Sequence, residues 1–139
     1  KDSLLRDLKN NLAAMQALGI PDDNFSGWYI PPYEWWNTAI AEWLAVQGIR
    51  LFSCTPGLGT PADYTYPEMG KAFKSNEQIV EILDKASQQQ PNGLNGSILL
   101  IHAGADSRRK EKLFTQLSAI IQQYTKQGYR FVRLDEMIH

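Results

Sequence analysis

The chain carries one continuous apolar run of strand length, Ser97-Ile98-Leu99-Leu100-Ile101-His102. Gly96 and Gly104 bound this run on its two sides. An uninterrupted apolar run of this length is typical of a strand buried on both faces, as in the parallel sheet of an α/β protein. The run therefore predicts a buried strand with His102 at its carboxyl end.

Segments with helical spacing alternate with two further strand-like segments around this run. Apolar spacing and end signals predict helices from Asp2 or Ser3 to Gly19, over 37–47, from Ser75 onward with Gln78 in a capping box, and over 110–127. Strands are predicted over 49–54 and 129–134. This alternation implies parallel pairing and an α/β layout. The Pro- and Gly-rich segment 55–74 is predicted to be a long loop, a feature that tends to be functional.

Length and composition bound the class of protein. The 139 residues are one domain's worth of chain, with 43% apolar and 21% charged residues, as in soluble globular proteins. The formal net charge of -1 argues against a nucleic-acid partner and against a polybasic membrane-surface protein. The single cysteine, Cys54, excludes an intrachain disulfide and a multi-thiolate zinc site. No segment reaches the roughly 18 apolar residues of a membrane span, and no signal peptide is visible.

His102 is the first candidate for chemistry. Sites in α/β sheets and barrels form at the carboxyl ends of strands, where this residue is predicted to lie. A histidine there can act as an acid, a base or a metal ligand near neutral pH. It can equally be a partly buried histidine bonded to a loop carbonyl, and position alone leaves both interpretations open.

An aromatic cluster is the second candidate. Six of the 15 aromatic residues lie between Phe25 and Trp36, and the cluster contains Pro31 and Pro32. The two prolines fix the backbone and predict neither a helix nor a central strand there. Held aromatic faces beside hydrogen-bonding groups suit sugar rings, so Tyr33 and Trp35 are predicted to line a cleft. Trp36 is predicted to be a core residue.

The remaining polar candidates have plainer interpretations. Asp63 in the long loop and Asp106 after the His102 run are interpreted as solvated loop or cap residues. The basic run Arg108-Arg109-Lys110 is interpreted as a solvated face, with anion binding as the alternative.

Three segments together resemble the polysaccharide deacetylases, the NodB-homology group of carbohydrate esterases. Tyr29-Ile30-Pro31-Pro32-Tyr33-Glu34 resembles the family's Arg-Pro-Pro-Tyr-Gly segment. Leu100-Ile101-His102 resembles its late Leu-x-His segment. Residues 96–138 follow the family's ending of strand, helix, Gly-Tyr, strand and an acidic-apolar close. The order and spacing of these segments carry the resemblance over nearly the whole chain.

The resemblance implies a distorted (β/α) barrel, or its C-terminal half, and metal-dependent hydrolysis of acetyl groups on N- or O-acetylated sugars. In that chemistry a divalent metal, zinc or similar, polarises the acyl carbonyl and activates a water. By resemblance, His102 lines the acetyl pocket and is the acid toward the leaving amine or alcohol. The backbone at Tyr33 helps to hold the oxyanion. Pro31, Pro32, Glu34 and Trp35 are the implied substrate-binding residues.

The chain departs from the family pattern at several points. The family's early Asp-Asp segment and its His-x-x-x-His segment have no counterpart, so no metal ligands are assigned in this chain and they are expected upstream of Lys1. Ile30 stands in place of the family's arginine, and Glu34 in place of its glycine. Asp63 is the nearest counterpart of the aspartate that orients the late histidine. Residues 1–139 are therefore predicted to form a single domain that is the C-terminal portion of a deacetylase domain.

Two functions follow from these observations. The first is a deacetylase-like hydrolase of carbohydrate metabolism that acts mainly on carbon–nitrogen non-peptide bonds. Its expected partners are an acetylated oligo- or polysaccharide and the protein's own N-terminal half or a second copy, and its expected location is secreted or in the cell envelope. The alternative is a non-catalytic carbohydrate-binding or interaction domain that lacks the metal centre.

Overall fold

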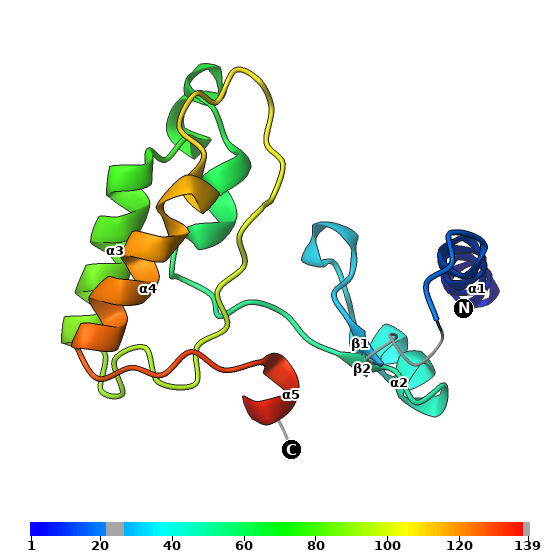
Figure 1. The fold of residues 1–139 in the computed structure, drawn as a ribbon. Helices are drawn as coiled ribbons and strands as arrows, with labels where there is room; N and C mark the ends of the chain where they lie inside the picture. The colour runs from blue at the N-terminus through cyan, green and yellow to red at the C-terminus, as the bar shows by residue number, and fades with distance from the viewer. Residues whose placement is uncertain (22–26, 138–139) are drawn as a thin grey trace. The chain divides into compact units, whose positions relative to one another are not determined.

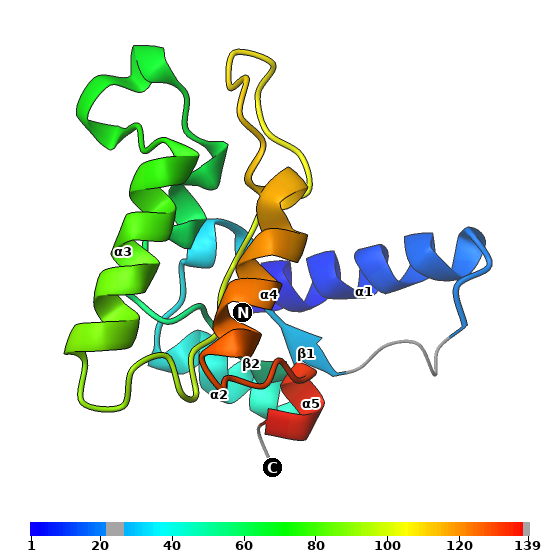
Figure 2. The same ribbon diagram turned by 60° about the vertical axis from the view of Figure 1, so that its left-hand side comes forward.

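The computed structural model describes residues 1–21 and 27–137. Two compact units make up the chain: unit 1 is Lys1–Ser53 and unit 2 is Cys54–His139. Figures 1 and 2 show the elements of each unit from two directions. The predicted aromatic residue Phe25 and the chain's second histidine, His139, lie outside the described residues.

Unit 1 contains a parallel pair of short strands joined by a helix. Its elements are α1 (Asp2–Ala17), β1 (Trp28–Tyr29), the 3₁₀ helix η2 (Pro32–Glu34), α2 (Thr38–Val46) and β2 (Arg50–Leu51). Trp28 lies opposite Arg50, and Tyr29 lies opposite Leu51. The Phe52 amide extends the ladder by donating to the Tyr29 carbonyl at 3.0 Å. This pair includes β1, which was not predicted as a strand, so it is not one of the pairings expected among 49–54, 97–102 and 129–134, and β2 is shorter than the predicted strand 49–54.

A small apolar core holds unit 1 together. Leu8, Leu44 and Ile49 are buried, and five half-buried residues pack against them: Leu4, Leu5, Tyr29, Ile40 and Leu51. The two predicted helices are confirmed because their apolar faces meet in this core. The cap of α2 is Asn37, whose Oδ1 accepts a hydrogen bond from the Ile40 amide at 2.9 Å. The cap position of α1 is Lys1, so the predicted capping by Asp2 or Ser3 is wrong.

One prediction about the aromatic cluster is wrong, that of a buried Trp36. The segment Pro32–Glu34 is a tight turn closed by short-range bonds rather than a regular helix, because Tyr33 and Glu34 have left-handed φ values. The Glu34 amide supplies one such bond, to the Pro31 carbonyl at 2.8 Å. Trp36 is 52% exposed rather than buried, because it precedes the cap of α2 and so lies outside the helical register that would turn it inward.

Unit 2 is built on two neighbouring helices. Its elements are the 3₁₀ helices η3 (Thr60–Tyr64), η4 (Pro67–Ala72) and η5 (Leu113–Gln116), and the α-helices α3 (Asn76–Gln89), α4 (Leu117–Lys126) and α5 (Leu134–Met137). Helices α3 and α4 lie side by side (Figure 1) and are joined by hydrogen bonds from Gln123 and Tyr124 to Asp84. The predicted capping box is confirmed: Ser75 Oγ accepts from the Gln78 amide, and Gln78 Oε1 accepts from the Ser75 amide.

The core of unit 2 lies between these helices and the segment before η3. Its buried members are Leu58, Ile79, Leu83, Ala86, Leu113, Ile120 and Tyr124. The helix predicted over 110–127 begins later, with a 3₁₀ turn at Leu113 that leads into α4. The segment 55–74, predicted to be a long loop, contains the two short 3₁₀ helices η3 and η4.

The apolar run that predicted a buried strand is irregular in the structure. Residues 97–102 and 129–133 form no strand, and the run 97–102 is half-buried. The backbone amides of Ile98 and His102 donate to side-chain oxygens of Thr55 and Asp63, so part of the ladder that a strand requires is replaced by contacts with side chains far away in the sequence. The sheet of the described residues has two strands. The (β/α) barrel, or its C-terminal half, stays an expectation from the resemblance.

Tyr124 should make unit 2 less stable at alkaline pH. Burial raises the pKa of its phenol, and the hydrogen bond to Asp84 raises the pKa further. Above the ordinary phenol pKa of about 10, the unfolded chain releases a proton that the folded chain retains. The free energy of unfolding should then fall by about 1.4 kcal/mol per pH unit from this group.

The Tyr124→Phe variant should lose this component of the pH dependence. Urea unfolding of both proteins at about pH 9 and about pH 11 measures it, and wild type should lose roughly 1.4 kcal/mol more than the variant across that interval. An equal decline in the two proteins would contradict the assignment. Other tyrosines titrate in both proteins and cancel in the difference.

Candidate functional site

A short helical turn positions Asp63 in unit 2. Helix η3 starts after Gly59, whose φ of 75° is left-handed, and has Pro61 in its first turn. A Cβ at Gly59 would meet Ile82 Cδ1 of α3 at 2.9 Å, so glycine allows η3 to pack closely on α3. This packing buries Asp63, which is only 2% exposed. The interpretation of Asp63 as a solvated loop residue is therefore wrong.

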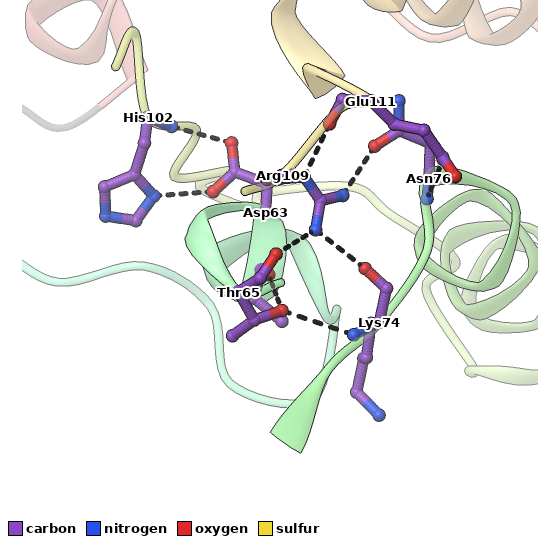
Figure 3. A network of polar contacts seen from close by, with 8 residues as sticks. Asp63, Thr65, Lys74, Asn76, His102, Arg109 and Glu111 are labelled. Atoms are coloured by element: carbon purple, nitrogen blue, oxygen red, sulfur yellow. Dashed lines mark hydrogen bonds and ion pairs between the residues drawn. The ribbon is translucent and has the colours of Figure 1, made fainter. Parts of the chain in front are cut away.

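Asp63 holds both the backbone and the ring of His102 (Figure 3). The backbone amide of His102 donates to Asp63 Oδ2 at 2.8 Å. The ring Nδ1 of His102 lies 2.5 Å from Asp63 Oδ1. Because an ionised carboxylate can only accept, the proton of the neutral ring belongs on Nδ1 and the lone pair on Nε2. One buried carboxylate thus fixes the position, the orientation and the tautomer of this histidine.

The other side of the His102 ring is open. Its side chain is 36% exposed, and Figure 3 shows the outer ring nitrogen directed away from Asp63. The ring of Tyr64 packs edge-on against it, with centroids 5.2 Å apart. A histidine oriented by a carboxylate, with its second nitrogen accessible, has the arrangement of an acid or base in proton transfer. The geometry therefore favours the functional interpretation over a bond to a loop carbonyl.

The basic run after His102 divides into exposed and buried side chains. Arg108 is exposed, stacks over the Tyr66 ring at 3.8 Å and pairs with both oxygens of Asp106 at 2.9 and 2.6 Å. This guanidinium holds the pKa of the Asp106 carboxyl well below its usual range. Lys110 is exposed as predicted, but Arg109 is only 1% exposed, so its interpretation as part of a solvated face is wrong.

Arg109 lies beside the Asp63 turn and binds backbone carbonyls (Figure 3). Its guanidinium donates to the carbonyl oxygens of Thr65 and Glu111, both at 2.6 Å, and to that of Lys74 at 2.9 Å. A further bond goes to Asn76 Oδ1 at 2.6 Å. Sequence reasoning missed Arg109 and its partners as members of the site. No signal in the sequence separates the buried Arg109 from its exposed neighbours Arg108 and Lys110.

The residues predicted to bind substrate lie in unit 1. Pro31 is buried, Glu34 is half-buried and Pro32 is exposed. Tyr33 and Trp35 are 89% and 81% exposed, and their rings lie 6.3 Å apart at 51°. The structure therefore brings Tyr33 and Trp35 together in unit 1, and it brings His102 together with Asp63 in unit 2.

The backbone of this turn adopts an unusual conformation. Tyr33 and Glu34 have φ values of 56° and 58°, in the left-handed region that favours glycine. Such a residue costs of order 1–3 kcal/mol, which the surrounding structure must offset. Glu34, which stands where the resembling family has glycine, thus adopts a left-handed conformation with a side chain present.

A mostly apolar cavity of unit 2 has a lining that does not include this pair. Its volume is about 610 Å³, and its lining includes Leu99, Ile101, Leu113 and Tyr124 but neither Asp63 nor His102. Thr60 Oγ1 also lines it, buried without a hydrogen-bond partner among residues 1–21 and 27–137.

The divalent metal of the resembling family does not fit the residues present. Across the described ranges, no group of three or more His, Cys, Asp or Glu side chains is placed to hold a metal ion. Asp63 and His102 are a pair bonded to each other, and Asp106 is engaged by Arg108. The carboxylates and the histidine of the described site are thus engaged with partners within the protein.

Comparisons with known proteins add no assignment. None of the helices in the described part of the chain is long and apolar enough to cross a membrane. No protein-family model, no curated protein and no solved structure matches the chain. The function is therefore argued from the Asp63–His102 pair and from the residues that hold it.

Proposed function

We propose that the protein is a hydrolase that removes acetyl groups from N- or O-acetylated sugars, with His102 as its acid–base residue. The observation that carries the proposal is the pairing of His102 with the buried Asp63 carboxylate. In the resembling polysaccharide deacetylases an aspartate orients the late histidine, and Asp63 takes that place here. The pairing supports the assignment of His102 on grounds independent of the short sequence motif around it.

His102 supplies a proton to the leaving group in this proposal. Its Nε2 takes up a proton from solvent, and the imidazolium is stabilised by the Asp63 carboxylate at Nδ1. As the carbon–nitrogen bond breaks, the Nε2 proton passes to the leaving nitrogen, and the free amine departs as acetate forms. With an O-acetyl substrate the same proton goes to the leaving oxygen.

The activation of water is assigned elsewhere. In the resembling family a divalent metal polarises the acyl carbonyl and activates the water. The described residues do not fit such a metal, so its ligands would come from outside them. The protein's own N-terminal half or a second copy is the partner we propose for that role.

The exposed aromatic turn of unit 1 is the proposed sugar-binding element. Tyr33 and Trp35 present two large ring faces on a backbone fixed by Pro31 and Pro32. Flat aromatic faces stack on the apolar C–H faces of sugar rings. The Tyr33 backbone and the Glu34 side chain supply polar groups beside these faces. An acetylated oligo- or polysaccharide is the proposed substrate, which favours a secreted or envelope location.

A second candidate function rests on the same aromatic turn. A non-catalytic carbohydrate-binding domain needs exposed aromatic faces on a preorganised backbone, and Tyr33 and Trp35 provide them. This function makes no use of the buried Asp63 carboxylate or of the open Nε2 of His102. The two candidate functions therefore differ in whether the activity of the protein requires His102.

Replacing His102 by alanine tests the proposal. The full-length protein, supplied with Zn²⁺ or Co²⁺, is assayed for acetate release from oligomers of N-acetylglucosamine and from O-acetylated oligosaccharides. We expect His102→Ala to lower the rate by at least about 10²–10⁴-fold, because general acid catalysis is worth that much. Oligosaccharide binding should persist in that variant, because His102 is not among the proposed stacking residues.

The control variants are Tyr33→Ala and Trp35→Ala, which should weaken oligosaccharide binding and leave the Asp63–His102 pair intact. If the wild-type protein releases no acetate from any of these substrates, the hydrolase proposal is wrong. Binding that is lost on Tyr33→Ala or Trp35→Ala would then establish the carbohydrate-binding alternative.

A further inference from the structure

We infer that Arg109 is a positioning residue that holds the Asp63 turn so that its carboxylate fixes the tautomer of His102. The inference rests on the proposed function of His102 and deepens it. It concerns a residue that the sequence pattern placed on a solvated face. Four hydrogen bonds, their acceptors and their place in the chain carry it.

The contacts of Arg109 span three separate segments of unit 2. Nη1 donates to the Thr65 carbonyl at 2.6 Å and to the Lys74 carbonyl at 2.9 Å. Nη2 donates to Asn76 Oδ1, and Nε to the Glu111 carbonyl, both at 2.6 Å. The guanidinium thus ties the end of η3, the start of α3 and its own segment to one point (Figure 3).

All four acceptors of Arg109 are neutral carbonyl oxygens. A buried charge without an acidic partner is costly unless hydrogen bonds satisfy it, and here four of them do. The Glu111 carboxylate accepts a hydrogen bond from the backbone amide of Asn76 at 3.0 Å. Asn76 is thereby held by Glu111 while its own side chain accepts from Arg109. Such a planar, multidentate arrangement is specific to a guanidinium, because a lysine ammonium cannot reproduce the fork.

Thr65 connects this network to Asp63. It directly follows η3, and its amide donates to the Ala62 carbonyl at 3.0 Å. Its hydroxyl donates to the same carbonyl at 2.5 Å and accepts from the Lys74 amide at 3.2 Å. Arg109 therefore binds Thr65, whose backbone amide and hydroxyl close the turn that contains Asp63.

Arg109 follows His102 by seven residues along the chain. His102 and Arg109 belong to one segment, so the bond to Thr65 links the segment of the histidine to the segment of its carboxylate. Besides the contact of Thr55 with Ile98, two points near the histidine join the segments: Asp63 with His102, and Thr65 with Arg109. Removing the Thr65–Arg109 contact should therefore loosen the Asp63–His102 contact, although no atom of Asp63 or His102 is changed.

The test reads the His102 ring directly by nitrogen NMR. The chain has two histidines, so a His139→Asn background leaves the signals of His102 alone. In wild type the neutral ring should show one dominant tautomer, with the proton on Nδ1. In Arg109→Lys, which keeps the charge and loses the fork, the two ring-nitrogen shifts should move toward each other as the second tautomer becomes populated. Acetate release should fall by up to about 10²-fold, as expected for a displaced catalytic group.

Two controls separate positioning from general stability. Leu83→Ala weakens the core of the same unit, and Arg108→Lys alters the adjacent, exposed guanidinium that pairs with Asp106. Both should keep the single tautomer of wild type. If Leu83→Ala mixes the tautomers as Arg109→Lys does, Arg109 acts only through stability and the inference is overturned.

Three further outcomes decide the remaining cases. If Arg109→Lys folds and keeps the single tautomer, Arg109 has no positioning role. If it does not fold, Asn76→Ala removes one of the four acceptors and should shift the tautomer in the same direction, and an unchanged tautomer there overturns the inference. If wild type shows the single tautomer and Arg109→Lys mixes it while no acetate is released, the hydrolase proposal fails and the positioning role stands.

Discussion

Replacing Asp63 by asparagine should lower the rate of acetate release by about 10²–10⁴-fold, because the replacement removes the control of the His102 proton. Asp63 offers two acceptor oxygens, one to the backbone amide of His102 and one to its ring. An asparagine offers one acceptor and an amide donor, so one of the two contacts is lost or the ring turns over to the other tautomer. A neutral side chain also fails to stabilise the imidazolium.

The measurement is steady-state acetate release by the full-length protein, with far-ultraviolet circular dichroism to confirm that the helices remain. Asp106→Asn is the matched control: Asp106 lies in the same unit, and its carboxylate binds Arg108 at the surface rather than His102. We expect its rate to stay within about twofold of wild type, as for a surface ion pair of small energetic weight. A wild-type rate in Asp63→Asn would remove Asp63 from the proposed mechanism.

Leu83→Ala should lower the free energy of unfolding by about 2–5 kcal/mol. Leu83 is only 1% exposed and belongs to the core in which α3 and α4 meet. Truncation removes buried methyl groups and leaves a space that the packed helices cannot fill. Urea unfolding, followed by the helical dichroism signal, measures the loss.

Leu117→Ala provides the comparison for this prediction. Leu117 lies on α4 and is 37% exposed, so the same truncation removes fewer buried contacts and should cost less than about 1 kcal/mol. Equal losses in the two variants would show that the core is not centred on Leu83.

The helices could be predicted from the sequence because their signals are local. Apolar residues at helical spacing predicted α1, α2 and α3, and the capping box at Ser75 predicted where α3 begins. Each of these signals lies within a few residues of the element that it predicts. The boundary of α4 was less well predicted, since the 3₁₀ turn at Leu113 carries the same apolar spacing as the helix that follows.

The strands could not be predicted with the same success, because a strand depends on a partner elsewhere in the chain. The run 97–102 has the composition of a buried strand. Yet the amides of Ile98 and His102 are taken by side chains from the segment 55–63. Side-chain oxygens that compete with a ladder have no signature within the run itself.

The candidate site was predicted in part. His102 was identified by its place after the apolar run and by the resemblance of its motif. Asp63 is separated from His102 by 39 residues, and its burial depends on the packing of η3 on α3. Three consecutive basic residues look alike in a sequence, and only tertiary structure buries Arg109 between two exposed neighbours. Three of the four Arg109 acceptors are backbone carbonyls, which no residue type encodes.

The division of the chain after Ser53 leaves all of its tryptophans in one unit. The chain has four tryptophans, and all of them lie in unit 1: Trp28, Trp35, Trp36 and Trp43. Tryptophan emission therefore reports on unit 1, whereas α3 and α4 of unit 2 contribute only to the helical signal. When Leu83→Ala is unfolded, an emission transition that coincides with the dichroism transition means that the two units unfold as one cooperative molecule. Separate transitions mean that each unit folds on its own.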